Sequence, residues 1–203
     1  MRLGLLVALV AVPATVLAQP APPSPAPPTA EESFAKGVQL QQSGDVLGAI
    51  EAYQDALGQE PQRIDARSNL GAAYVRLGRY DEAVGEYRRA LEIDPGHAGV
   101  RFNLALALYK SALIPDAARE LEQVLTLDPK NTAAILLLAD CRLQMGNEAG
   151  VIALLESHEG DLGQDRLYVY LMGTALLRRN QLERGQVFID RLFRRAIPRP
   201  SGS

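Results

Sequence analysis

The 203-residue chain has no tryptophan, one cysteine and two histidines, and aromatic residues make up only 5% of it. Because Cys141 is the only cysteine, no disulfide bond can form within the chain. One cysteine and two separated histidines, His97 and His158, do not form the ligand cluster that a metal site needs. We expect Cys141 to fill a small buried slot and both histidines to be structural or solvated.

The sequence also lacks the short motifs of common catalytic chemistry. It has no phosphate-binding loop, dinucleotide fingerprint, G-x-S-x-G turn or H-E-x-x-H pair. Its acidic residues occur in runs such as YDEA and ELE, which are typical of helix caps and surface ion pairs. We therefore expect a protein that is not an enzyme and binds no cofactor or metal, although a site assembled from scattered residues stays open.

The first 18 residues differ from the rest. Arg2 is followed by an uncharged apolar stretch up to Ala18, interrupted at Pro13. This pattern predicts a secretory signal peptide, residues 1–18, cut near Ala18, and hence a periplasmic or secreted protein. The alternative is an uncleaved anchor, but the stretch is short for a membrane span and contains a proline. A proline-rich linker follows at residues 19–29 and acts as a spacer.

From residue 30 onward the same residue types return with a period of 34. Pro61, Pro95 and Pro129 are spaced by this period. The resulting units are 30–63, 64–97, 98–131, 132–165 and 166–199, followed by a tail at 200–203. Each unit is predicted to form a helical hairpin, with helix A at positions 2–14, a turn at 15 and 16, and helix B at 18–31.

Small and large residues alternate within each predicted hairpin. Position 8 is always Gly or Ala, whereas position 24 is always large, which indicates close packing of the two helices. Gly44, Gly78 and Gly146 occupy position 15, where a helix end commonly needs a left-handed residue. The fourth unit departs from the pattern through Arg142, His158 and Gly163, and its second helix is expected to be short.

The second unit resembles the tetratricopeptide repeat family. The residues that carry the resemblance are Leu70, Gly71, Tyr74, Ala83, Tyr87, Ala90, Pro95 and the turn GRYDEA. The resemblance extends in the same register over residues 30–199. It implies an all-α, right-handed α-solenoid of five helix-turn-helix repeats that acts as a non-catalytic scaffold for a protein or peptide partner.

In that family the concave face binds peptides through positions 2, 5, 9, 12 and 13 of helix A. The candidate groove residues implied here are Phe34, Val38, Ser68, Ala72, Val75, Arg76, Phe102, Leu106, Tyr109, Lys110, Leu136, Asp140, Leu143, Tyr170 and Thr174. Most are apolar or aromatic, and the first unit has Phe34 and Val38 in place of the Lys and Asn with which family members hold a C-terminal carboxylate. The expected ligand is therefore a mainly apolar peptide, although about half of the apolar residues could instead pack against neighbouring helices.

The C-terminal part suggests an alternative function. Residues 166–203 contain 8 basic and 2 acidic residues in a chain of net charge −3, and the last predicted helix is apolar with no capping helix after it. The chain could therefore be a structural component that self-associates or docks on an envelope assembly through this end. The basic excess favours an anionic partner or membrane headgroups, unless the arginines only terminate the helix. Nucleic acid is disfavoured because no stacking aromatics alternate with the arginines.

Overall fold

In the computed structural model of the protein, residues 27–194 are described and contain 11 helices and no strand. The first six helices are α1 (Ala30–Ser43), α2 (Val46–Gln59), α3 (Ile64–Arg76), α4 (Tyr80–Ile93), α5 (Ala98–Lys110) and α6 (Ile114–Leu127). The others are α7 (Thr132–Gln144), α8 (Glu148–Glu156), α9 (Glu159–Leu162), α10 (Arg166–Arg178) and α11 (Leu182–Arg194). The predicted signal peptide, most of the linker and the 200–203 tail lie outside the described residues.

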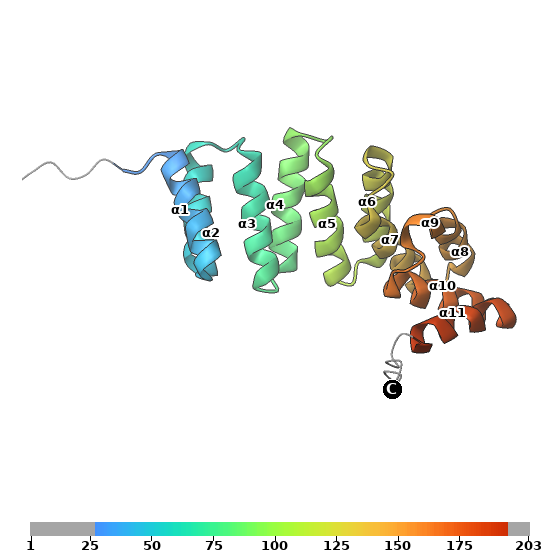
Figure 1. Ribbon diagram of the computed structural model, residues 1–203. Coiled ribbons are helices and arrows are strands. Elements are labelled where there is room, and N and C mark those ends of the chain that lie inside the picture. Colours follow the sequence, from blue (N-terminus) through green and yellow to red (C-terminus); the bar gives the residue numbers. More distant parts are fainter. Residues whose placement is uncertain (1–26, 195–203) are drawn as a thin grey trace, which may run out of the picture.

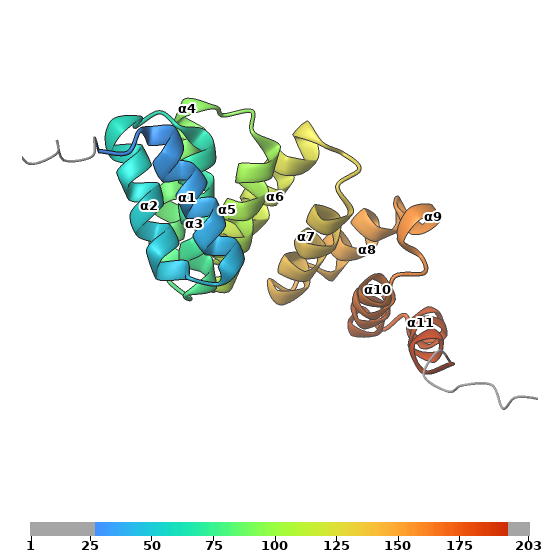
Figure 2. The same cartoon turned by 60° about the vertical axis from the view of Figure 1, so that its left-hand side comes forward.

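The helices form five hairpins that stack in chain order (Figure 1). The hairpins are α1–α2, α3–α4, α5–α6, α7–α8 and α10–α11, and the second helix of each packs on the first helix of the next. Figure 2 shows how the later hairpins turn away from the first three, so that the array is extended and curved. The predicted all-α solenoid of five hairpins is confirmed. None of the described helices is long and apolar enough to cross a membrane.

The left-handed turn at position 15 recurs in all five hairpins. Gly44, Gly78 and Gly146 have φ angles of 90°, 72° and 71°, as their residue type predicts. Ala112 and Asn180 occupy the same position in the third and fifth repeats, both with φ of 59°. The stack therefore imposes the conformation even where the residue does not favour it.

The small residues at position 8 receive the large residues of position 24. A Cβ atom added at Gly37 would lie 2.6 Å from the ring of Tyr53, and one added at Gly71 would lie 2.7 Å from the ring of Tyr87. In the third and fourth repeats position 8 is the larger Ala and position 24 is the smaller Leu, and all four side chains are fully buried. Those two pairs are Ala105 with Leu121 and Ala139 with Leu155. The volume within each hairpin is thus kept by complementary sizes.

The buried side chains form two hydrophobic clusters that meet at α7. One side of α7 contributes Leu138 and Cys141 to the cluster of the first repeats, and Ile135 and Ala139 belong to the cluster of the last repeats. Cys141 is fully buried, as predicted, and burial raises the pKa of its thiol to about 11. The thiol is therefore protonated and unreactive near neutral pH.

The fourth repeat departs from regularity where the sequence indicates. Its second helix, α8, ends at Glu156, and the single-turn α9 follows, with Leu162 buried in the second cluster. Arg142, which stands at a position that is apolar in the other repeats, donates hydrogen bonds to the Gly150 carbonyl at 3.1 Å and to Glu122 at 3.0 Å. The arginine thus bonds to its own partner helix, α8, and to α6 of the preceding repeat.

Candidate functional site

The first helices of the repeats, α1, α3, α5, α7 and α10, carry the predicted groove residues. Neighbouring first helices touch in three places, α1 with α3, α3 with α5, and α7 with α10, so the candidate positions form a stripe across several repeats. The partly buried members are Phe34, Val38, Ser68, Ala72, Val75, Phe102, Leu106, Tyr109, Leu136, Asp140 and Thr174. Arg76, Lys110 and Tyr170 are exposed.

One predicted groove residue is a core residue. Leu143 is only 5% exposed and belongs to the second hydrophobic cluster, so its assignment to the groove is wrong. The fourth repeat is shortened after α8, and α10 packs against both α7 and α8 there. Position 12 of this repeat is therefore covered by protein, which the repeat pattern alone does not reveal.

Phe34, at the N-terminal end of the stripe, is covered on one side. Its ring centre lies 5.9 Å from that of Tyr53, and the Arg63 guanidinium carbon lies 4.2 Å from the Phe34 centroid. Arg63 is held there by Glu31 at 2.6 Å and Asp65 at 3.0 Å. The hydrogen bond to Asp65 is the main cause of the raised pKa of Arg63. This cation therefore restricts access to Phe34.

A polar centre interrupts the apolar stripe between the third and fourth repeats. The Tyr109 hydroxyl donates to Asp140 Oδ2 at 2.5 Å, and the Gln144 amide donates to Asp140 Oδ2 at 2.7 Å and to the Tyr109 hydroxyl at 3.0 Å. The bond to Asp140 raises the pKa of Tyr109. Both bonds to the carboxylate reach Oδ2, so Oδ1 can accept a bond from a ligand.

Two cations on the stripe have structural partners. Arg76 donates to the carbonyl of Gln41 at 3.1 Å, and Arg178 donates to the carbonyl of Leu143 at 3.2 Å. Each arginine thereby satisfies the C-terminal end of the first helix in the preceding repeat. Lys110 occupies the same position in the third repeat and has no partner among residues 27–194.

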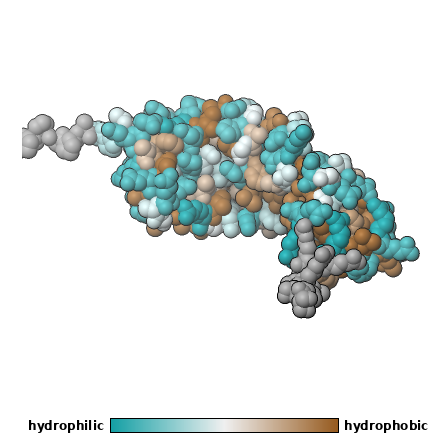
Figure 3. All heavy atoms as spheres, in the orientation of Figure 1, coloured by the Kyte–Doolittle hydropathy of each residue, from teal (hydrophilic) through white to brown (hydrophobic). Residues whose placement is uncertain are grey.

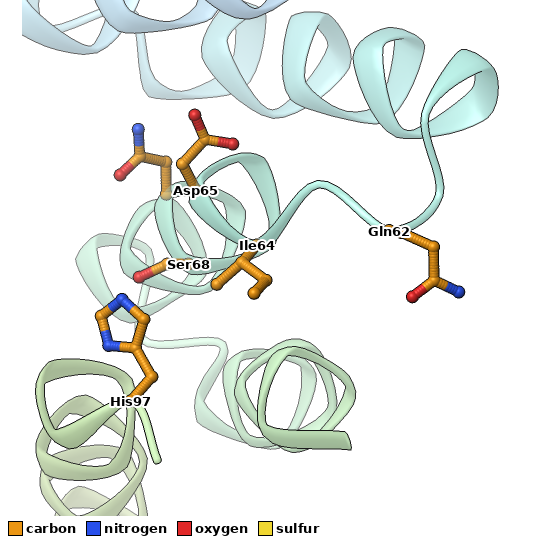
Figure 4. A pocket seen from close by; sticks show the side chains of 6 residues that line it. Gln62, Ile64, Asp65, Ser68 and His97 are labelled. Carbon is orange, nitrogen blue, oxygen red and sulfur yellow. The ribbon is translucent and has the colours of Figure 1, made fainter. Parts of the chain in front are cut away.

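An open recess of about 530 Å³ lies beside the stripe, between the starts of α3 and α5. Figure 4 shows the His97 ring directed toward Ser68, with Ile64 beside Ser68 and Asp65 above. Gln62 and Asn69 complete the lining. His97 Nδ1 accepts a bond from the backbone N–H of Val100 at 3.3 Å, so Nε2 carries the ring proton.

Only Ser68 of this recess is among the predicted groove residues. His97 was expected to be structural or solvated, and it does cap α5, but its ring also forms a wall of the recess. The signal in the sequence that could have placed His97 here is its position just after Pro95, in the loop between the second and third repeats. Sequence spacing alone does not show that the inter-repeat loop brings it toward Ser68.

A second recess, of about 490 Å³, lies at the C-terminal end of the array. Its lining consists of Arg166, Leu167, Tyr170, Leu192 and Phe193, from the start of α10 and the end of α11. Its lining is more apolar and aromatic than that of the first recess. The side chains of Tyr170 and Phe193 are accessible, with exposed fractions of 49% and 67%. Tyr170 is the only predicted groove residue in it.

No group of three metal-binding side chains occurs among the described residues. His158 has an exposed neighbourhood at the start of α9, where its Nδ1 lies 2.9 Å from both the Ser157 hydroxyl and the Leu154 carbonyl. It is thus tied to the end of α8 and takes no part in either recess.

Five stacked hairpins, with a partly apolar stripe along their first helices, define a helical repeat protein of the solenoid type. Models of the tetratricopeptide repeat match residues 34–98, 78–121 and 113–174. These matches span repeats one to four and the start of the fifth. The chain belongs to the tetratricopeptide repeat family.

Solved structures share this fold at low sequence identity. The MamA protein matches with a TM-score of 0.77 and 18% identity, covering 81% of this chain and 90% of MamA. YrrB, described as a TPR protein with an unusual peptide-binding site, matches with a TM-score of 0.73 and 18% identity over 80% of this chain and 84% of its own.

The first TPR of Spaghetti (RPAP3), solved with the HSP90 peptide SRMEEVD, matches with a TM-score of 0.56 and 21% identity over 58% of this chain and 93% of its own. No curated protein sequence matches this chain. At these identities the likeness concerns the fold.

Proposed function

We propose that this protein is a non-catalytic adaptor that binds a peptide segment of another protein along the stripe of α1, α3, α5, α7 and α10. The observation that carries the proposal is a row of partly buried apolar side chains at positions 5 and 9 of the first helices α1, α5 and α7. The row comprises Val38, Phe102, Leu106 and Leu136. Peptide binding by YrrB and by the RPAP3 repeat supports this use of the fold.

The chemistry of the stripe favours a mainly apolar segment with a hydrogen-bond donor at its centre. Leu106 and Leu136 offer apolar surface to the ligand's side chains. Between these helices the free Oδ1 of Asp140 can accept a bond from a backbone or side-chain donor of the ligand. A C-terminal carboxylate is a poorer fit, because Phe34 and Val38 supply no donor in the first repeat.

The proposal is tested by selecting ligands from a displayed peptide library and measuring their affinity by fluorescence anisotropy. Leu106→Glu buries a charge beside the ligand, so we expect affinity to fall at least tenfold, or about 1.4 kcal/mol. Leu47→Glu is the matched control, because Leu47 is 62% exposed and lies on α2, outside the stripe. Peptides without apolar enrichment, or equal affinity for both variants, would contradict the proposal.

We also propose that the adaptor works in the periplasm or cell envelope. The support is the sequence of residues 1–18, with Arg2 before an apolar stretch that ends near Ala18. Expression in a Gram-negative host, followed by fractionation and N-terminal sequencing, is the test. A chain that begins at Gln19 in the periplasmic fraction is expected, whereas an intact N-terminus in the cytoplasm would refute export.

A further inference from the structure

The last repeat exposes two apolar side chains whose equivalents in some earlier repeats pack against the hydrophobic core. Position 17 is Val46 in the first repeat and Ile114 in the third, and both pack against the core. Position 28 is Leu91 in the second repeat, where it is 9% exposed. In the fifth repeat these positions are Leu182 and Phe193, which are 59% and 67% exposed. We call the surface between them, with Leu167 and Tyr170, the C-terminal face.

The element that fits this face is a helix. In each earlier junction, the second helix of one repeat is covered by the first helix of the next. Leu182 and Phe193 are 11 residues apart on α11, so the apolar surface extends about 16 Å along the helix, which is about three turns. Position 21 between them is Gln186, whose amide donates to Asp190 at 2.8 Å, and this gives the face a polar middle.

Unpaired cations border the C-terminal face at both ends. Arg166 lines the recess with Phe193, and Arg179 lies in the turn three residues before Leu182. Neither arginine has a partner among residues 27–194, whereas Arg184 is paired with Glu156 at 2.7 Å. Figure 3 shows hydrophobic residues among strongly hydrophilic ones over this part of the molecule. A covering element with carboxylates at its flanks would complement the charges of these two arginines.

The other end of a second copy of this chain does not complement the C-terminal face. Helix α1 presents Glu32, Lys36 and Gln39 at positions 3, 7 and 10, and all three are exposed. The same positions in later repeats are buried, for example Leu70 and Ala73 in α3. Stacking α11 of one copy on α1 of another would bury these polar groups, which is costly. Two C-terminal faces in a symmetric pair would bring like charges together.

We propose that the C-terminal face binds an amphipathic helix of another protein, with an apolar stripe that covers Leu182 and Phe193 and with carboxylates that pair with Arg166 and Arg179. This site lies on the end of the array and overlaps the stripe of first helices only on α10, at Leu167 and Tyr170. The protein then joins two partners, one along the stripe and one at its end.

The test uses the purified chain and two labelled 18-residue helical peptides with the same leucine face, one flanked by glutamates and one by lysines. Anisotropy should show at least tenfold tighter binding of the glutamate peptide. Leu182→Glu/Phe193→Glu should abolish this binding, and Arg166→Glu/Arg179→Glu should reverse the preference in favour of the lysine peptide. Because all four side chains are exposed, melting temperatures should stay unchanged.

Controls separate this site from the stripe and from other occupants. Leu47→Glu and Leu106→Glu should leave the affinity for the glutamate peptide unchanged, so the peptide-binding proposal can fail without this one. Three results would overturn the inference: equal affinity for both peptides, no binding at about 1 mM peptide, or an unchanged preference in the arginine variant. Two further results would overturn the inference if the chain does not bind the peptide and the result is lost in Leu182→Glu/Phe193→Glu. One is a dimer in light scattering, and the other is co-sedimentation of the chain with phosphatidylglycerol vesicles.

Discussion

At the scale of single residues, the hairpins depend on glycines whose surroundings differ. Gly71 and Gly85 both lie inside helices of the second repeat. A Cβ atom at Gly71 would press on the Tyr87 ring, whereas one at Gly85 would meet no atom within 4 Å. The same substitution should therefore have opposite effects at these two positions.

We expect Gly71→Ala to lower the free energy of unfolding by about 1 to 3 kcal/mol, because the ring of Tyr87 must move away from the added methyl group. Gly85→Ala should raise it by up to about 1 kcal/mol, because alanine is the better helix former in open space. Urea unfolding followed by circular dichroism measures both changes. A stabilised Gly71→Ala variant would show that the ring has room.

Ion pairs between the two helices of a repeat are a stabilising interaction that hydrophobic periodicity does not predict. Arg67 pairs with Glu86 at 2.9 Å and Arg101 with Glu120 at 2.7 Å, at positions 4 and 23 of the second and third repeats. Each arginine also donates to the carbonyl of the proline in the preceding loop. The signal in the sequence is the recurrence of Arg at position 4 and Glu at position 23 in both repeats.

At the scale of the elements, each turn between helices A and B places position 15 in the left-handed region. Ala112 is the residue there that is least suited to this conformation, which costs an L-residue about 1 to 2 kcal/mol. Sequence alone indicates the turn at the three glycines. At Ala112 and Asn180 the conformation follows only from the stacking of neighbouring repeats.

Ala112→Gly should therefore stabilise the protein by about 0.5 to 1 kcal/mol, because glycine adopts the left-handed conformation without a steric penalty. The reciprocal variant Gly78→Ala, at the equivalent turn with φ of 72°, should destabilise it by a similar amount. Thermal unfolding of the two variants beside the wild type is the measurement. A lower melting temperature for Ala112→Gly would contradict this account.

The fourth repeat shows where element boundaries depend on tertiary contacts. Sequence predicts its short second helix from the loss of the regular residues after Glu148. That the chain then forms α9 and buries Leu162 follows from the space that the shortened α8 leaves beside α10. The 34-residue pattern cannot predict α9, because the residues of this segment do not follow the pattern.

At the scale of the whole molecule, the described core contains ionisable side chains that burial holds in their neutral form, and three of them have large pKa shifts. Burial raises the pKa of Tyr87 and Tyr168 from 10.0 to about 12 and that of Cys141 from 9.0 to about 11. All three folded-state values lie above the unfolded ones, so their contribution is complete at low pH. It is lost as the unfolded chain deprotonates while the folded chain stays neutral.

The contribution of these three groups to the free energy of unfolding should therefore be constant below about pH 8.5 and fall between about pH 9 and pH 12. Urea titrations across this range measure the loss. Tyr87→Phe should make the decline shallower above pH 10, and Cys141→Ala should do so between pH 9 and pH 11, because alanine fills the equivalent slot in α3, α5 and α10. A decline of the same slope in both variants would assign the effect to other groups.

The sequence by itself determined the repeat length, the five hairpins and the sizes of the packed pairs, because a 34-residue period repeats the same local requirements in every unit. Tertiary structure decided which stripe residues are accessible: it buried Leu143, covered Phe34 with Arg63, and joined Tyr109, Asp140 and Gln144 into one polar centre. It also left Leu182 and Phe193 exposed at the end of the array. Accessibility depends on neighbouring repeats in space, and these differ at the ends and at α9 even where the pattern along the chain is the same.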